Sequence, residues 1–408
     1  MSALPAGWAW TTLGEIGEWR GGGTPSKRVE RYWDGDIPWV SPKDMKVERI
    51  RDTLDHISRE AVAESSTTLV PAGSVLVVTR SGILSHTLPV AVAEREVALN
   101  QDLKALVPVD GVVSEYVAWG LRAHAQQILR ECSKAGTTVA NLETSRLLGF
   151  RIPLAPLNEQ RRIVAAIEEH LSRLDAADAS LGAAERKLSV ARRSIREAEF
   201  DGQWDRVPLG EVVDNLDSQR VPVNRTERAN RPGTVPYYGA TGQVGWIDAP
   251  LFNEELCLVG EDGAPFLDAD KDKAYVIDGP SWVNNHAHVL RALAGITSNR
   301  YLKHALDAVD YEPFVNGTTR LKLTKRALNQ IPIPVPPLEE QRRIVAEVEE
   351  KLSVIDAMRA SIANAQRRST ALRAAILERA FCGELVPQDP ADEPAEGLLA
   401  RIRAKLDP

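Results

Sequence analysis

The chain has 408 residues, of which 43% are hydrophobic and 26% charged, and its formal net charge at pH 7 is −7. This composition is typical of a soluble protein with more than one domain, and its acidic balance excludes a generic nucleic-acid coat but leaves room for a local basic groove. No apolar run approaches the ~20 residues of a membrane helix, so we expect no membrane partner. Cys132, Cys257 and Cys382 lie far apart, which argues against disulfides and zinc and indicates a reducing cytoplasm.

The first predicted domain, residues 1–155, contains a glycine-rich run from Arg20 to Arg28. Three glycines allow its backbone to approach a ligand closely. The run lacks the GK[ST] ending of a nucleotide-binding loop and is not followed by a helix pattern. Two interpretations stay open: a surface hairpin loop, or a contact with a DNA backbone through Arg20, Thr24 and Lys27.

A polar turn, Thr79-Arg80-Ser81, follows a β-branched run that starts at Ser74. Such a turn could deliver Arg80 to a guanine edge or a phosphate, or Arg80 could only cap the strand through an ion pair. Lys43 lies in an earlier polar segment and is a further candidate contact. Short strands mixed with an amphipathic helix over residues 114–130 predict an α+β domain.

Residues 156–200 are predicted to form one long central helix, because apolar residues recur in them every seven positions. A narrow apolar stripe of this spacing pairs with another helix. About 43 residues at ~1.5 Å each give a rod of about 65 Å, which suits a spacer. The neighbouring row turns polar, as at Asp178 and Arg192, and polar seam residues fix register and partner. The apolar seam consists of Ile167, Leu174, Leu181, Leu188 and Ile195.

A second copy of this helix is predicted at residues 337–383. Pro153 and Gln160 recur as Pro334 and Gln341, 181 residues later, and Gly-Thr-Thr at 136–138 recurs at 317–319 with the same offset. A repeat that keeps its register across a strand, a proline-rich hinge and a helix has copied a whole structural unit. The chain is therefore predicted to consist of two half-molecules. The second seam consists of Val348, Ile355, Ile362 and Ile376, with Ser369 at the remaining position.

The second predicted domain, residues 201–336, shares few residues with the first beyond the repeated ends. Polar side chains that could contact a ligand occur in three of its segments. The run Gly317–Arg326 is the most basic, and its alternation of cations with buried leucines places several cations on one side. The candidates are Tyr238, Thr241, Asn285, His286, Arg320, Lys322 and Lys325.

Catalytic and metal-binding patterns in the chain are weak. His286 and His288 share one face of a strand, as in some metal sites, but no third ligand is evident, so packing and hydrogen bonding are favoured and no metal is predicted. Asp270-Lys-Asp-Lys273 contains the acid-x-Lys pattern found in nuclease sites, although charged residues in loops are usually only solvated. The chain contains no dinucleotide-binding loop, HExxH or GxSxG pattern. We therefore predict no catalytic residue.

The doubled motif Pro-Leu-x-Glu-Gln-Arg-Arg-Ile-Val, beginning at Pro156 and Pro337, resembles the specificity (S) subunit of type I restriction-modification enzymes. The Gly-Thr-Thr and Ile-Pro motifs, the tail from Ala375 to Pro390 and the segment Tyr32–Trp39 resemble the same family, over essentially the whole chain. The resemblance implies an α+β fold, with two target-recognition domains of mixed strands and short helices separated by two long antiparallel coiled-coil helices.

The same resemblance implies a function. Each recognition domain is expected to read one half of a bipartite sequence in double-stranded DNA, while the helices set the spacing and dock two modification (methyltransferase) subunits. This chain would then be non-catalytic and bind no cofactor itself. S-adenosylmethionine would be bound by the modification subunits, and ATP and Mg would serve a restriction (translocase) subunit. Residue type and turn context, not the family, select the candidate DNA contacts named above.

The last segment, residues 384–408, is predicted to be a linker followed by a short helix from Ala395 to Leu406 that packs on the N-terminal region. Two other functions stay open. One is a coiled-coil scaffold that joins two protein-binding domains without DNA. The other is a metal-dependent nuclease that uses His286 and His288.

Overall fold

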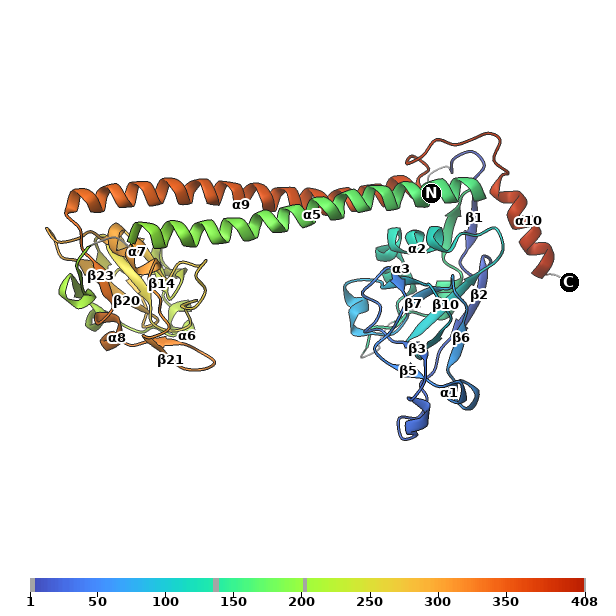
Figure 1. Ribbon diagram of the computed structural model, residues 1–408, viewed down its shortest axis with the longest axis horizontal. Helices are drawn as coiled ribbons and strands as arrows, with labels where there is room; N and C mark the ends of the chain where they lie inside the picture. The colour runs from blue at the N-terminus through green and yellow to red at the C-terminus, as the bar shows by residue number, and fades with distance from the viewer. Residues whose placement is uncertain (1–3, 135–138, 201–203, 407–408) are drawn as a thin grey trace. The chain divides into compact units, whose positions relative to one another are not determined.

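The computed structural model describes residues 4–134, 139–200 and 204–406, which form two compact units. Unit 1 comprises residues 1–178 and 367–408, and unit 2 comprises residues 179–366. Each unit contains a domain of strands and short helices together with parts of two long helices (Figure 1). Within the described residues, no helix combines the length and the apolar character that crossing a membrane requires.

The described residues of unit 1 form two sheets and a separate strand pair. The five-stranded sheet is ordered β2 (Gly17–Gly21), β10 (Leu103–Pro108), β7 (Val75–Val78), β8 (Val90–Ala93) and β4 (Arg49–Ile50). The four-stranded sheet is ordered β5 (His56–Ile57), β3 (Ile37–Val40), β9 (Val97–Leu99) and β6 (Thr68–Val70), and β1 (Ala9–Thr12) pairs with β11 (Arg151–Leu154). The continuous apolar runs of β7 and β8 are fully buried, since α2 (Ser114–Ala123) packs on them.

The short helices of unit 1 connect these strands. They are η1 (Glu30–Tyr32), α1 (Arg59–Glu64), η2 (Gly82–Ser85), α3 (Ala125–Cys132) and α4 (Thr144–Leu148). The single helix predicted over residues 114–130 is wrong, because it is interrupted at His124. The ring of His124 lies against Phe150 and Phe381, and its Nδ1 is 2.9 Å from the carbonyl oxygen of Gly120. This tertiary packing ends α2 and starts α3.

In unit 2, outside residues 201–203, the strands form two four-stranded sheets and two strand pairs. One sheet is ordered β13 (Val213–Asn215), β20 (Ala287–Ala292), β17 (Leu256–Gly260) and β18 (Ala274–Ile277). The other is ordered β15 (Gly242–Ile247), β14 (Val235–Gly239), β19 (Pro280–Val283) and β16 (Phe252–Asn253). The pairs are β12 (Arg206–Pro208) with β23 (Pro332–Pro334), and β21 (Val315–Asn316) with β22 (Lys322–Leu323). The helices are η3 (Leu209–Glu211), η4 (Asp217–Gln219), α6 (Arg225–Ala229), α7 (Asn299–Asp307), which packs on β17, β18 and β20, and α8 (Lys325–Asn329).

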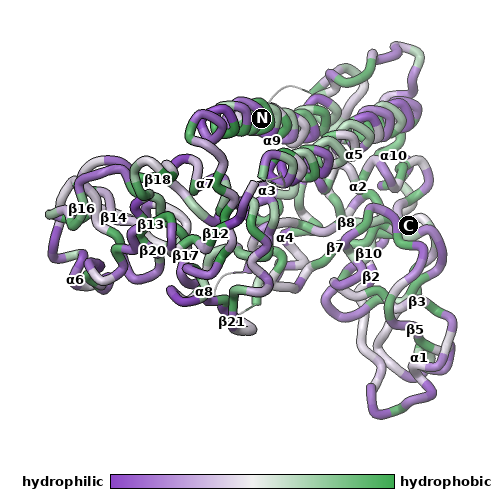
Figure 2. The backbone as a smooth tube through the Cα atoms, turned by 60° about the vertical axis from the view of Figure 1, so that its left-hand side comes forward, coloured by the Kyte–Doolittle hydropathy of each residue, from purple (hydrophilic) through white to green (hydrophobic). Residues whose placement is uncertain are grey.

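The two long helices are α5 (Leu157–Phe200) and α9 (Leu338–Phe381), which confirms both predicted helices. They pair antiparallel, because residue numbers rise along one helix as those of its contacts fall along the other. In unit 1, Arg373 contacts Asp175 at 2.7 Å. In unit 2, Lys351 Nζ lies 2.6 Å from Glu199 Oε1, and Arg192 Nη1 lies 2.7 Å from Asp356 Oδ1. Hydrophobic and hydrophilic residues alternate along both helices (Figure 2).

The apolar seam residues of both helices are buried or half-buried. Ile167 and Val348 are fully buried, and Ile355 is 5% exposed. In the polar row, Arg373 contacts Asp178 at 2.8 Å in unit 1, and Arg359 contacts Glu185 at 3.2 Å in unit 2. The polar row therefore forms ion pairs between the helices, which hold the register as the sequence predicts.

The internal repeat is visible in matching hydrogen bonds. At the start of α5, Gln160 Nε2 donates to the carbonyl of Ala155 at 2.9 Å. At the start of α9, Gln341 Nε2 donates to the carbonyl of Pro336 at 2.9 Å. Each unit thus anchors the beginning of one long helix in the same way. The first copy of Gly-Thr-Thr, at 136–138, lies outside the described residues.

The ends of the long helices repeat as well. Phe200 ends α5 and packs on Tyr301 in unit 2, with ring centroids 5.5 Å apart. Phe381 ends α9 and packs on Tyr116 in unit 1 at 5.1 Å. Each tyrosine hydroxyl donates to the carbonyl of a repeated proline, at 2.8 and 2.9 Å respectively. The predicted fold class, with its two-fold repeat and antiparallel helix pair, is confirmed.

The C-terminal segment packs on the N-terminal part of unit 1, as predicted. The helix α10 (Ala395–Leu406) buries Leu398 and Ile402 in the core of unit 1, and the backbone N–H of Ala395 donates to the carbonyl of Gly7 at 2.8 Å. Ahead of it, Asp392 pairs with Arg162 of α5 at 2.8 Å. The tail therefore links the beginning of α5 to the N-terminal strand region.

Candidate nucleic-acid interface

In unit 1, the glycine-rich loop is pinned to its own domain. A Cβ atom at Gly22 would lie 2.2 Å from the carbonyl oxygen of Asn100, and the carbonyl of Gly23 accepts a hydrogen bond from Trp39 Nε1 at 3.1 Å. The glycines therefore serve close packing of the loop on the strand end near residue 100. This packing explains the glycines without a ligand, and it fixes the loop that carries the candidate contacts.

Of the candidate contacts in this loop, two lie on the surface. Thr24 is exposed and its hydroxyl contacts Gln101, and the ammonium of Lys27 lies 5.9 Å from the ring centroid of Trp33. Arg20 pairs with Glu18 at 2.7 Å, so its charge is balanced locally. Thr24 and Lys27 are therefore better placed for an external ligand than Arg20.

The candidate contacts in the polar turn after β7 also differ in their exposure and in their local partners. The side chain of Thr79 is buried and its hydroxyl donates to the carbonyl of Asp102 at 3.2 Å, which removes it from the candidate contacts. The Ser81 hydroxyl accepts from the N–H of Ile83 at 3.4 Å and caps η2, so it has a local structural role. Arg80 is exposed, with Nε 4.0 Å from Asp102 Oδ1. Lys43 is also exposed.

In unit 2, four segments that are far apart in sequence meet at one edge of the domain, which we name the four-loop edge: residues 238–241, 260–263, 284–286 and 320–323. Backbone hydrogen bonds join them. The N–H of Asn284 donates to the carbonyl of Tyr238 at 3.0 Å, and the N–H of Glu261 to that of His286 at 2.8 Å. The N–H of Leu323 donates to the carbonyl of Glu261 at 2.7 Å. Candidate contacts chosen from three separate sequence segments are therefore brought together.

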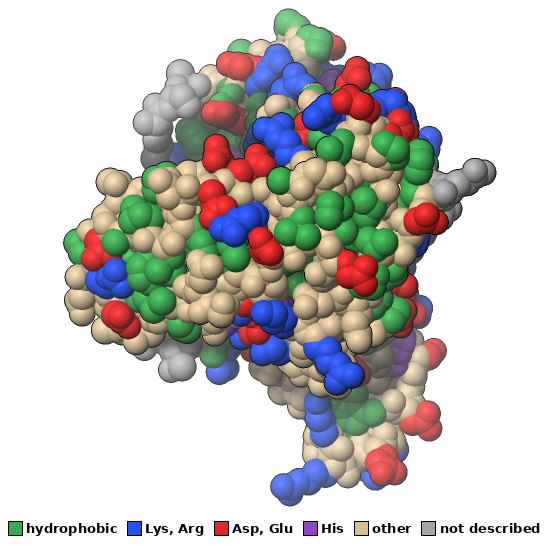
Figure 3. Space-filling view, turned by 90° about the vertical axis from the view of Figure 1, so that its left-hand side faces the viewer, with side chains coloured by type: hydrophobic (Ala, Val, Ile, Leu, Met, Phe, Trp, Pro, Cys, Tyr) green, Lys and Arg blue, Asp and Glu red, His purple; other side chains and the backbone are tan. Residues whose placement is uncertain are grey.

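The exposed layer of the four-loop edge carries paired charges. Asp262 Oδ1 lies 2.7 Å from His286 Nδ1 and 2.8 Å from Arg320 Nη2. Lys322 Nζ lies 3.2 Å from Glu261 Oε1. Thr241 and Asn285 are exposed at this edge, Tyr238 is half-buried there, and Lys325 is exposed in α8 just after it. Lys and Arg side chains lie intermingled with Asp and Glu on the face of the molecule seen in Figure 3.

Beneath this layer lies a buried charged cluster around His288, which is 1% exposed. Its Nδ1 is 2.6 Å from Asp217 Oδ2 and its Nε2 is 2.9 Å from the carbonyl of Leu323. Arg220 Nη1 lies 2.8 Å from Glu261 Oε2. Burial raises the pKa of Asp217, but the hydrogen bond from His288 and the charge of Arg220 outweigh it, so the pKa is lowered from 3.8.

Asp217, Glu261 and His288 bring potential ligand atoms within 4.8 Å of one another. A separation of 2.6 Å between His288 Nδ1 and Asp217 Oδ2 is a direct hydrogen bond, since two ligands at ~2.1 Å from one ion lie about 3 Å apart or more. Arg220 also occupies the carboxylates that an ion would need. The cluster therefore fits hydrogen bonding, and His286 contacts a different carboxylate, that of Asp262.

The Asp270–Lys273 loop docks the domain of unit 2 onto the long helices. Asp270 contacts Arg359 of α9 at 2.6 Å, and Asp272 contacts Arg192 of α5 at 3.0 Å. Burial raises the pKa of Asp272, but the charges of Lys303 and the neighbouring arginines lower it strongly overall. The amine of Lys273 donates to the backbone carbonyls of Asp268 and Lys271, each at 2.6 Å. The nuclease-like pattern thus has a structural explanation.

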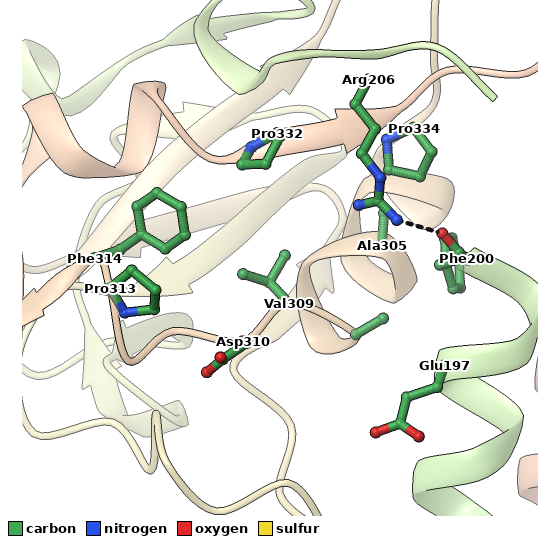
Figure 4. A pocket seen from close by; sticks show the side chains of 11 residues that line it. Glu197, Phe200, Arg206, Ala305, Val309, Asp310, Pro313, Phe314, Pro332 and Pro334 are labelled. Atoms are coloured by element: carbon green, nitrogen blue, oxygen red, sulfur yellow. Dashed lines mark hydrogen bonds between the residues drawn. The ribbon is translucent and has the colours of Figure 1, made fainter. Parts of the chain in front are cut away.

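A cavity of about 490 Å³ lies between the end of α5, β12, β23 and the end of α7 (Figure 4). Arg206 donates from Nη2 to the carbonyl of Phe200 at 2.9 Å at its edge. Two carboxylates line the cavity: Glu197 comes from α5, and Asp310 comes from the loop after α7. The eleven lining residues include no histidine, serine, threonine, cysteine or lysine, so they supply no nucleophile or general base beyond these carboxylates.

Comparison with known families decides the identity of the chain. The family model described as type I restriction modification DNA specificity domain matches residues 5–179 and again residues 202–365. The chain belongs to the family of type I restriction-modification specificity subunits. The two matches cover both halves of the internal repeat, so this specificity subunit carries two copies of the family domain.

Curated relatives of this specificity subunit match parts of it. It is 44% identical over 161 residues to the type I restriction enzyme EcoR124I/EcoR124II specificity subunit of Escherichia coli, covering 39% of this chain and 40% of that protein. It is 32% identical over 170 residues to the type I restriction enzyme MjaIX specificity subunit of Methanocaldococcus jannaschii, covering 41% of this chain and 38% of that protein. These matches span less than half the length of each relative.

Two solved structures share the fold of this specificity subunit. One is the HsdS subunit from Thermoanaerobacter tengcongensis, with a TM-score of 0.58 and 21% identity, covering 94% of this chain and 98% of that chain. The other comes from a study of complex assembly and conformational transition of the type I R-M system, with a TM-score of 0.76 and 21% identity, covering 94% of this chain and 100% of that chain.

Proposed function

We propose that this chain is the DNA sequence-recognition subunit of a type I restriction-modification complex, in which the domain of each unit reads one half of a bipartite target. The observation that carries the proposal is the doubled specificity domain with matching anchors and unlike polar loops. The starts of α5 and α9 are anchored alike through Gln160 and Gln341. The backbone of the four-loop edge also repeats, since the bridge between Asp262 and Lys322 matches one between Arg80 and Asn141 in unit 1, but the side chains at these positions differ. Two domains with the same backbone anchors but different exposed side chains are suited to recognising two different half-sites.

The long helices are proposed to set the spacing of the two half-sites and to dock two modification subunits. Their ion pairs, such as Arg359 with Glu185, support a fixed register, which a spacer needs. Several apolar side chains of the pair are about half exposed, at Val190, Val354, Met358 and Leu372, and these suit contacts with partner proteins. The proposed partners are therefore double-stranded DNA, two methyltransferase subunits and a restriction (translocase) subunit, in the cytoplasm.

The chain itself is proposed to be non-catalytic. S-adenosylmethionine would be held by the modification subunits, and ATP and Mg would serve the restriction subunit. The fit of the Asp217, Glu261 and His288 cluster to hydrogen bonding supports this division, as does the docking role of the Asp270–Lys273 loop.

A duplex-binding assay of the reconstituted complex across salt concentrations tests the proposal. If cations such as Lys27, Arg80 and Lys325 contact phosphates, the logarithm of the affinity must fall linearly with the logarithm of salt, by about 0.9 for each phosphate neutralised. A scaffold without DNA binding would show no duplex affinity at any salt concentration. That result would refute the proposal.

A domain exchange tests whether each domain determines one half of the recognised sequence. Replacing residues 201–336 by the matching domain of another specificity subunit should change one half of the methylated sequence and leave the other half unchanged. Mapping methylated adenines in host DNA reads both halves at once. A change in both halves would contradict independent reading by the two domains.

A further inference from the structure

We infer that Asp262 fixes Arg320 and His286 in one orientation as a base-reading pair, and so determines sequence discrimination in the half-site of unit 2 without contacting DNA itself. Asp262 is in this sense a positioning residue. The inference rests on the proposed function, because it assigns the reading surface of unit 2 within that function. It goes beyond the candidate contacts, which were cations and polar groups chosen by residue type.

The geometry that points to this role is a shared carboxylate oxygen. Oδ1 of Asp262 accepts from Arg320 Nη2 at 2.8 Å and lies 2.7 Å from His286 Nδ1. The side chain of Asp262 is 20% exposed, that of His286 39% and that of Arg320 60%. The carboxylate is therefore the inner member of the group, and the two nitrogen-bearing side chains are the outer members.

The outward atoms suit recognition of base edges. Among the described residues, Nη1 and Nε of Arg320 and Nε2 of His286 have no hydrogen-bond partner. The Nε–H and the N–H groups of Nη1 point to different sides of the guanidinium, so each donates by itself, and either can donate to O6 or N7 of guanine. In its neutral tautomer with the proton on Nδ1, His286 donates to the carboxylate of Asp262 and presents Nε2 as an acceptor, which suits the amino group of cytosine or adenine.

The backbone at Gly263 allows the side chain of Arg320 to lie close to the loop. Gly263 has φ +69°, and a Cβ atom there would lie 3.3 Å from Arg320 Nε, so glycine lets the guanidinium lie close to the loop. The N–H of Gly263 donates to the carbonyl of Leu321 at 3.2 Å, which ties the loop to the segment that carries Arg320. The arginine is thus held by the loop and by Asp262.

The residue before Asp262 holds the loop from the inner side. Glu261 pairs with Arg220 at 2.8 Å and with Lys322 at 3.2 Å. Its N–H donates to the carbonyl of His286, so the two segments cannot separate without losing this hydrogen bond. Reading of base edges requires side chains held to within about half an ångström, and this double support provides it.

The charge of Asp262 gives an independent argument. A carboxylate at a DNA-facing edge opposes the attraction between cations and phosphates and so weakens non-specific binding. Its contribution must then lie in orienting its two partners. The effect of its removal is therefore expected in discrimination between sequences, with little loss of overall affinity.

The experiment compares Asp262→Asn, Arg320→Ala and the double variant in the full complex with its modification subunits. Binding is measured to the cognate duplex, to duplexes with one changed base pair in the half-site of unit 2, and to duplexes changed in the half-site of unit 1. Asp278→Asn is the matched control, because it removes the same charge at the opposite end of the β17–β18 ladder, where the side chain is exposed.

Asp262→Asn should reduce the preference for the cognate base pair by about 5- to 150-fold at one or two positions in the half-site of unit 2. The preference in the half-site of unit 1 and the affinity for random DNA should stay unchanged or rise slightly. The double variant should discriminate no worse than Arg320→Ala at the position that Arg320 reads. Asp278→Asn should behave as the wild type.

Three results would overturn the inference. These are unchanged discrimination in Asp262→Asn, equal loss of affinity on all duplexes, and independent effects of the two substitutions in the double variant. Hydrogen exchange of β17 and β20 in each variant separates a local effect from unfolding, and Gly263→Ala provides a second perturbation of the same arginine. If the wild-type complex itself shows no sequence preference, the proposed function fails instead, so the two failures are distinguishable.

Discussion

Replacing Arg196 by Met tests how the domain of unit 2 is held on the long helices. Arg196 lies on α5 and is 2% exposed. Its Nη1 donates to the carbonyls of Ala269 at 3.3 Å and Lys271 at 3.4 Å. Its Nη2 contacts Asp272 and lies 3.6 Å from Asp307 Oδ2. One buried guanidinium therefore joins the docking loop and α7 to α5.

The expected loss of stability follows from what the substitution leaves behind. Removing one partner of a buried ion pair costs about 3–5 kcal/mol, because the other charge stays buried without compensation. Here Lys303 Nζ remains 3.0 Å from Asp307 and 3.4 Å from Asp272, so both carboxylates keep a counter-ion. Methionine also keeps most of the apolar stem. We therefore expect the lower end of the range, about 3 kcal/mol.

Hydrogen exchange under mild denaturant measures this loss separately in each unit. A loss of about 3 kcal/mol should speed global exchange of β17 and β20 in unit 2 by about 100-fold, since ~1.4 kcal/mol corresponds to a factor of ten. Exchange of β7 and β10 in unit 1 should not change. Arg193→Met is the control: that side chain is 53% exposed and 3.7 Å from Glu197, so its loss should cost about 0–1 kcal/mol.

Two outcomes would refute this reasoning. A loss below about 1 kcal/mol would mean that the cost of desolvating Arg196 cancels its attraction to the carboxylates. Equal acceleration in β7 and β17 would mean that the two units unfold together, so that the substitution does not report on docking of one domain.

Three further predictions concern other contacts. Tyr301→Phe removes the hydrogen bond to the carbonyl of Pro334 and should cost about 1–3 kcal/mol in unit 2 alone, measured by hydrogen exchange of β17 and β20. Because the pKa of Asp217 is lowered from 3.8, its contribution is complete above that value and is lost as pH falls through the lowered pKa, so Asp217→Asn should reduce the acid sensitivity of unit 2 in urea unfolding. Arg162→Ala removes the pair with Asp392, should cost about 1 kcal/mol, and should speed limited proteolysis of residues 384–394.

Each of these predictions has a control variant or an outcome that would contradict it. The equivalent tyrosine of unit 1, Tyr116, should give a matching loss confined to unit 1, and a loss that crosses between the units would contradict the repeat. Unchanged acid sensitivity in Asp217→Asn would show that the His288 cluster does not contribute to acid stability. Arg161→Ala, an exposed neighbour on α5, should leave the tail as resistant to protease as in the wild type.

The sequence predicts the long helices well because their signals are local and doubled. A seven-residue period and a constant offset of 181 residues locate α5 and α9 within two residues of their observed ends. The break between α2 and α3 escapes prediction for the opposite reason. The nearest glycine, Gly120, lies inside α2, and the break depends on packing of His124 against Phe150 and Phe381, which are distant in sequence.

The candidate interface could be predicted only in part. Selection by residue type finds polar and basic side chains in three of the four segments of the four-loop edge, but it omits Asp262, since an acid is not expected beside DNA. The available signal was the glycine-flanked pair Glu261-Asp262 directly after a buried strand run. Its partner Arg320 is 58 residues away, and only the folded chain shows the contact.

The direction of the helix pair is a case in which the charges decide. If α5 and α9 paired in parallel at the offset of the repeat, Arg192 would face Arg373 and Asp175 would face Asp356, which places like charges together, while Asp178 would face Arg359 as an opposite charge. In the antiparallel pair, Arg373 meets Asp175 and Asp178, and Arg192 meets Asp356. The polar row lowers the stability of the seam relative to leucine, but its ion pairs match opposite charges more completely in the antiparallel orientation than in the parallel one. These ion pairs therefore help a repeated sequence to specify a single arrangement.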